Sequence, residues 1–198
     1  MDADTKAYIE NLDITSVPWR RMFTAYGTAE RYAELFSELE QAADADQWQK
    51  TFFRLSDFEH QSTLFPPAPF ALVFLVRMLR NRLEAGKPDE ISNRMIDQFA
   101  YYVGICVRAE QLEHARQLEH FWDLLDDQNL LPEDYTEDDL LDVFEDPEAV
   151  SDELFYSFYY YSLLVLSQVP DVLDRSGMFS EESKRIREEL RPIADMLA

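Results

Sequence analysis

Apolar residues recur every three or four positions along most of this chain, a spacing that gives an α-helix one buried face. Only four glycines occur in 198 residues, and this scarcity disfavours architectures built from β-hairpins or from glycine-dependent phosphate loops. The apolar segments come in pairs with short connections, which favours helical hairpins over a four-helix bundle. We therefore predict an all-α fold of stacked antiparallel helical hairpins, with about seven to nine helices.

Caps and helix breakers place the expected helices along the chain. The proline-rich segment 66–69 suits the start of a helix rather than its middle. Asp46, Thr136, Ser151 and Ser180 are the expected N-caps, because each precedes an apolar-periodic segment. The expected helices cover about residues 28–43, 46–58, 70–83, 89–108, 110–127, 136–144, 151–167 and 180–193.

Composition and charge narrow the class of protein. Hydrophobic residues make up 46% of the chain, enough for a globular core despite a formal net charge of −22. We expect a single domain over 1–198, with an acidic C-terminal helical part over 89–198. The charge disfavours direct binding to nucleic acid or to anionic membranes, and it favours cationic protein partners. A single cysteine, Cys106, and no recognisable signal peptide lead us to expect a cytoplasmic protein.

One segment carries most of the excess negative charge. No lysine or arginine lies between Arg116 and Arg175, yet these 58 residues contain seventeen aspartates and glutamates. An aromatic run, 155–161, follows the acids, and a helix cannot bury so many rings on one stripe. We therefore expect some of its tyrosines to face outward, where tyrosine is favoured at interfaces. The predicted partner-binding residues are Asp134, Glu137, Asp138, Asp139, Asp142, Glu145, Asp146, Tyr156, Tyr159 and Tyr160. The competing interpretation is a solvated face that only keeps the protein soluble.

The N-terminal half resembles a family of bacterial HEAT-repeat-like proteins over about residues 10–83. The resemblance lies in the entry segment 12–19, which ends in Val17-Pro18-Trp19, in the segment 25–29, which begins Ala25-Tyr26-Gly27, and in His60-Gln61 ahead of the proline-led segment 67–70. Ser62 stands where the family usually has glycine, which leaves the conformation of that turn open. The resemblance implies a small α-solenoid, and some such proteins are similar to immunity proteins that neutralise a cognate toxin.

The residues of this signature also have structural interpretations. We expect Trp19 and Tyr26 to cover the open end of the helical stack, and Gly27 to supply a turn that a side chain would obstruct. We expect His60 to bond a backbone carbonyl at a helix end rather than to bind a ligand.

Patterns for catalysis are weak. Asp138-Asp139-Leu140-Leu141-Asp142 matches the aspartate-rich motif of all-α prenyl-transferring enzymes, which holds magnesium diphosphate. However, the nearest lysine or arginine lies 22 positions before Asp138 and 33 positions after Asp142, too far along the chain to meet a diphosphate locally. Three histidines form neither a zinc motif nor a di-iron motif. We therefore expect no enzymatic activity, no cofactor and no metal.

These observations lead to an expectation about function. We expect an immunity or antitoxin protein that occludes a cognate toxin with a basic surface, through the acidic, tyrosine-flanked surface. The runner-up is a HEAT-like adaptor or scaffold that binds an endogenous protein and has no toxin partner. A magnesium-dependent enzyme is the third possibility.

Overall fold

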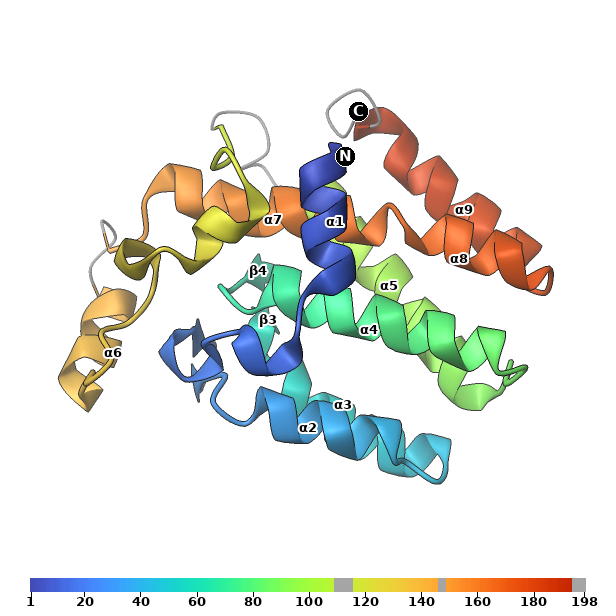
Figure 1. Cartoon of the computed structure of the whole chain (residues 1–198), viewed down its shortest axis with the longest axis horizontal. Coiled ribbons are helices and arrows are strands. Elements are labelled where there is room, and N and C mark those ends of the chain that lie inside the picture. Colours follow the sequence, from blue (N-terminus) through green and yellow to red (C-terminus); the bar gives the residue numbers. More distant parts are fainter. Residues whose placement is uncertain (109–115, 146–148, 194–198) are drawn as a thin grey trace.

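The computed structural model describes residues 1–108, 116–145 and 149–193 and is built mainly from α-helices (Figure 1). The expected all-α class is confirmed, whereas stacking into a HEAT-like solenoid stays a prediction. The helices are α1 (Ala3–Asn11), α2 (Tyr32–Glu40), α3 (Ala45–Leu55), α4 (Ala68–Glu84), α5 (Glu90–Val107), α6 (Glu137–Glu145), α7 (Asp152–Leu166), α8 (Val169–Ser176) and α9 (Ser180–Leu190). Two short hairpins are formed by β1 (Phe23–Thr24) with β2 (Gly27–Thr28) and by β3 (Glu59–His60) with β4 (Thr63–Leu64).

Helix α4 is central to the packing. Its segment from Ala68 to Val76 is buried at every position, because α4 packs against α7 on one side and also against α5 and α8. Helices α2 and α3 pair with each other on one side of α4 and α5, and α8 pairs with α9 on the other (Figure 1). Buried side chains from Ile9 to Leu190 form one hydrophobic cluster. Helix α6 projects from the end of the molecule opposite α8 and α9.

The expected helix over 110–127 is wrong where the structure describes it. Residues 116–120 are not helical, and two short 3-10 helices, Phe121–Leu125 and Asp127–Asn129, follow. Residues 109–115 lie outside the described part of the chain. The reason is a pair of contacts with α7. The Leu118 N–H donates to Ser157 Oγ at 2.8 Å, and the Leu118 carbonyl accepts from the Tyr161 hydroxyl at 2.7 Å. These long-range bonds satisfy the backbone groups that a helix would otherwise pair.

The expected caps are partly confirmed. Thr136 and Ser151 each accept a backbone N–H of the helix that follows, from Asp139 at 3.3 Å and from Leu154 at 3.2 Å. Asp46 is not a cap, because Asp44 takes this role by accepting the Gln47 N–H at 2.8 Å. Ser180 is the first residue of α9, whose N-cap Phe179 makes no side-chain capping bond. The sequence interpretation missed α1, α8 and both hairpins.

The two hairpin turns contain residues with unusual backbone angles. Gln61 and Ser62 have positive φ angles of 51° and 67°, a conformation that glycine adopts at lower cost than other residues. Ser62 therefore stands at a position where the backbone is left-handed. Gly27 has a φ of 149°, a backbone conformation that residues with a side chain rarely adopt. A Cβ atom placed there would meet no atom within 4 Å, so the backbone angle, and not a contact with neighbouring residues, favours glycine in this turn.

Candidate functional site

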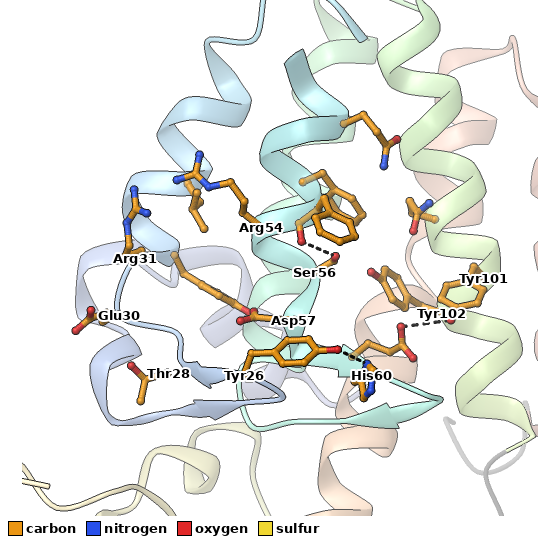
Figure 2. A pocket seen from close by; sticks show the side chains of 17 residues that line it. Tyr26, Thr28, Glu30, Arg31, Arg54, Ser56, Asp57, His60, Tyr101 and Tyr102 are labelled. Atoms are coloured by element: carbon orange, nitrogen blue, oxygen red, sulfur yellow. Dashed lines mark hydrogen bonds between the residues drawn. The ribbon is translucent and has the colours of Figure 1, made fainter. Parts of the chain in front are cut away.

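A cleft of about 730 Å³ opens between α2, α3, α5 and the two hairpins (Figure 2). Its walls combine aromatic rings with charged and amide side chains. None of its lining residues was among the predicted partner-binding residues. Side chains that define the cleft are Tyr26, Arg54, Asp57, Glu59, His60 and Tyr101.

Asp57 is a half-buried lining residue of this cleft and bonds residues from neighbouring elements. Its Oδ1 accepts the Tyr32 hydroxyl at 2.5 Å, and its Oδ2 accepts the Thr24 hydroxyl at 2.9 Å. Its backbone carbonyl accepts the Ala25 N–H at 3.0 Å. Burial raises the pKa of Asp57, although both hydroxyl bonds oppose that rise by favouring the carboxylate. One residue thus joins the end of α3 to α2 and to β1.

The two hairpins meet at the mouth of the cleft. The Tyr26 hydroxyl and His60 Nδ1 are 2.9 Å apart, and the two rings pack edge to face at 5.1 Å (Figure 2). Tyr26 is 74% exposed, so the expectation that it covers the end of a stack is wrong, whereas Trp19 is buried. His60 bonds a side-chain hydroxyl rather than the expected carbonyl. The tips of two hairpins, 34 positions apart in sequence, are therefore linked.

The charged side chains that line the cleft include two arginines and the acids Glu30, Asp57 and Glu59. Arg31 bonds Glu34 at 3.0 Å, and Arg54 bonds Glu38 at 2.8 Å. Both arginines lie on the α2 side, away from Tyr101 and Tyr102 (Figure 2). Because both arginines already have carboxylate partners, the cleft presents mainly carboxylates to a ligand: Asp57 and Glu59, which are partly buried, and Glu30, which is exposed.

The predicted acidic residues lie apart from this cleft, on α6 and the segment before it. Asp134, Glu137, Asp138 and Asp142 are exposed. Asp139 is half-buried, and its carboxylate accepts both the N–H and the hydroxyl of Thr136 at 2.7 Å. These two bonds lower the pKa of Asp139.

Two further predicted residues cannot be placed with this group. Asp146 and the side chain of Glu145 lie outside the described residues. The rest of α6 is amphipathic: Leu141 and Phe144 are 54% and 48% exposed beside the acids. We name Asp134, Glu137, Asp138, Leu141, Asp142 and Phe144 the acidic surface.

The predicted tyrosines do not flank this surface as expected. Tyr156 is buried and Tyr159 is only 1% exposed, whereas Tyr160 is half-buried. The expectation of outward-facing rings is therefore wrong for Tyr156 and Tyr159, because α7 packs against both α4 and α5 and is covered on more than one face. The Tyr159 hydroxyl instead bonds the hairpin beside the cleft: it accepts the Leu64 N–H and donates to the Ser62 carbonyl, each at 3.2 Å.

The hairpin of β1 and β2 lies between the cleft and the acidic surface. Thr28 lines the cleft, and its hydroxyl is 3.4 Å from that of Tyr135, in the segment before α6. Phe23 packs edge to face against Phe144, with ring centroids 6.0 Å apart. Arg21 binds the start of the acidic segment through the Leu131 carbonyl at 2.6 Å. The two regions therefore adjoin through the N-terminal hairpin.

The aspartate-rich motif has a simple geometry. Asp138 and Asp142 are exposed one turn apart, while Asp139 turns back to Thr136. Across residues 1–108, 116–145 and 149–193, no group of three or more His, Cys, Asp or Glu side chains is placed to hold a metal ion. Over the same ranges, no helix has the length and apolar character needed to cross a bilayer.

One sequence pattern indicates an exposed aromatic ring on the wall of the cleft. Phe52 and Phe53 are neighbours on α3, so one of the two rings must leave the buried stripe, and it is Phe53, at 77% exposure. The contact between Tyr26 and His60 had no local signal, since it joins two hairpins. The chain matches none of the protein-family models, curated proteins or solved structures with which it was compared.

Proposed function

We propose that this chain is an immunity or antitoxin protein that binds a cationic toxin domain through the acidic surface and occludes it. The observation that carries the proposal is the exposure of Leu141 and Phe144 between exposed carboxylates on one short helix. Large exposed apolar side chains surrounded by charge are typical of protein-binding surfaces. The resemblance of residues 10–83 to bacterial HEAT-repeat-like proteins, a group that includes immunity proteins, supports the same conclusion.

The charges of this surface suit a basic partner. In the part of the chain that the structure describes, Asp134, Glu137, Asp138 and Asp142 form no ion pair with a lysine or arginine. Their field is therefore not neutralised locally, and it accelerates the approach of a cationic protein. Leu141 and Phe144 supply apolar surface that loses its contact with water on binding.

Occlusion explains inhibition without chemistry by this chain. A toxin that acts on nucleic acid or on nucleotides has a cationic site for phosphate groups. The carboxylates of α6 occupy such a site in place of phosphate, and the rest of the helical protein blocks access to it. Inhibition is then stoichiometric.

The test begins with the adjacent upstream gene, where an immunity protein is expected to have its toxin. The C-terminal domain encoded there would be expressed with and without this chain, and growth and binding affinity would be measured. We expect protection from toxicity and a complex that weakens as salt rises. Replacing Asp134, Glu137, Asp138 and Asp142 by lysine is expected to weaken binding by at least about a hundredfold, since close charge pairs contribute about 1.5–7 kcal/mol at interfaces.

A matched control variant distinguishes the effect of the acidic surface on binding from the effect of the total charge. Replacing the exposed acids Glu40, Glu84, Glu181 and Glu188 by lysine changes the net charge equally but leaves the acidic surface intact. This variant should bind within a few-fold of the unchanged protein. Equal weakening by both variants would reject the acidic surface as the interface. A chain that neither binds nor protects against the neighbouring domain would instead favour the adaptor function.

A further inference from the structure

The cleft between the two hairpins and α3 is a second exposed aromatic region of the molecule. Of the described residues, six large apolar side chains are exposed, and five of these lie either at the cleft or on α6. The three at the cleft are Tyr26, Phe53 and Tyr101, and the other exposed side chains are Leu141, Phe144 and Met178. Exposed aromatic rings gathered around a cleft that also holds polar groups are typical of ligand-binding sites.

We propose that this cleft binds an arginine side chain of a protein partner, with the guanidinium between the carboxylates of Asp57 and Glu59 and the rings of Tyr26 and Tyr101. This inference goes beyond the proposed function, because it concerns other elements of the fold and can be tested without a toxin. Its site adjoins the acidic surface through the β1–β2 hairpin, so one partner can contact both.

The electrostatics favour a cation over an anion. Arg31 and Arg54 are the arginines that line the cleft, and each is bonded to a glutamate of α2, at 3.0 Å and 2.8 Å. An anionic ligand would have to compete with those glutamates. A cation instead meets Asp57 and Glu59 with no rearrangement of ion pairs.

The recessed carboxylate retains capacity for a ligand. Each oxygen of Asp57 accepts one internal hydroxyl, from Tyr32 or from Thr24, and a carboxylate oxygen can accept a second bond. Glu59 is positioned by the Tyr101 hydroxyl, which donates to it at 3.3 Å. The two internal bonds to Asp57 fix its plane, and a fixed plane is the arrangement to which a guanidinium fork binds well.

The rings select arginine over lysine. Tyr26 is held by His60 at the mouth, and Tyr101 lies on α5 across the cleft (Figure 2). A guanidinium stacks its flat face on such rings while its edge donates to carboxylates. The lysine ammonium has no flat face and holds its water more strongly, so it gains less in this setting.

The test uses the full-length chain, labelled with ¹⁵N and observed by NMR, and the peptide acetyl-Gly-Gly-Arg-Gly-Gly-amide. We expect saturable shifts at Tyr26, Asp57 and Tyr101, with a Kd on the order of 1 mM for a single side chain. The same peptide with neutral citrulline should bind at least about tenfold more weakly, because it keeps the shape but loses the charge. The lysine peptide should bind about threefold more weakly than the arginine peptide.

Variants locate the binding. Glu59→Gln should weaken the arginine peptide about tenfold and Tyr26→Ala about threefold; both side chains lie at the cleft, and Tyr26 is largely exposed. An unchanged amide spectrum outside the cleft shows that each variant is folded. Asp138→Asn with Asp142→Asn removes two charges from α6 and should change the affinity less than twofold.

Each opposite outcome overturns the proposal. Binding that the α6 variant weakens as much as Glu59→Gln reflects only the general negative charge. Equal binding of the citrulline peptide removes the need for a cation, and equal binding of the lysine peptide removes the role of the guanidinium. Absence of saturable shifts also rejects the site. None of these outcomes touches the proposed function, whose failure would appear only with the toxin domain.

Discussion

The cleft and the acidic surface are both rich in carboxylates, but the two regions hold them in opposite ways. In the cleft, Asp57 is recessed beneath two hydroxyl donors, and burial raises its pKa. On α6, Asp139 bonds the backbone and hydroxyl of Thr136, three positions earlier, and these bonds lower its pKa. The same chemical group is therefore tuned in opposite directions by its surroundings.

The two regions are stabilised by different kinds of contact. The cleft depends on contacts between distant segments, such as Tyr26 with His60 and Tyr159 with the β3–β4 hairpin. The acidic helix depends on a local cap and on a limited set of contacts, including Phe23 with Phe144. We therefore expect the cleft to be sensitive to core substitutions and the acidic surface to be tolerant of them.

The largest difference should appear when one phenylalanine is truncated in each region. Phe58 is fully buried beneath the cleft and packs on Tyr102 at 5.2 Å, so Phe58→Ala should lower the free energy of unfolding by about 3–5 kcal/mol. Phe144 is half exposed, and Phe144→Ala should cost less than about 1 kcal/mol. Urea denaturation followed by circular dichroism measures both. Similar losses of stability in the two variants would show that Phe144 is packed as firmly as Phe58.

A smaller effect should distinguish two neighbouring tyrosines of α7. Tyr159→Phe removes the bonds to Leu64 and Ser62 and leaves a buried N–H without its acceptor, so it should cost about 1–3 kcal/mol. Tyr160→Phe is the matched control and should change stability by less than about 0.5 kcal/mol, because that ring is half-buried. Hydrogen exchange at Leu64 provides a local readout. A stable Tyr159→Phe with unchanged protection of Leu64 would contradict the anchoring role of this hydroxyl.

The smallest effect concerns proton binding. The folded-state pKa of Asp57 is raised above 3.8, so folding favours its protonated form and its contribution to stability falls as the pH rises through and above 3.8. The pKa of Asp139 is lowered below 3.8, so its contribution is present above 3.8 and is lost as the pH falls through the lowered value. Carboxyl ¹³C NMR titration measures both.

One substitution tests why the pKa of Asp139 is lowered. Thr136→Ala removes the hydroxyl donor, so it should return the pKa of Asp139 toward 3.8 and leave that of Asp57 unchanged. Midpoints of Asp57 and Asp139 on the same side of 3.8 would remove the contrast between the two regions.

The elements that the sequence predicted best are those with local signals. Helix α4 follows from its apolar run and proline start, and the caps at Thr136 and Ser151 lie where the residue types predict. The prediction of a helix over 110–127 was wrong because Ser157 and Tyr161 bind the backbone of Leu118, a contact across about 40 positions. Asp57 and His60 could not be assigned to a cleft, since their partners lie on other hairpins and helices.

Two properties follow from the amino-acid sequence alone: the all-α class and the concentration of negative charge in one acidic segment. These follow from spacing and charge, which act over a few residues. The burial of Tyr156 and Tyr159 depends on tertiary contacts. So does the position of Tyr26, Asp57 and Glu59 around one cleft. Burial of a ring depends on how many neighbouring elements cover its helix, and α7 is covered by both α4 and α5.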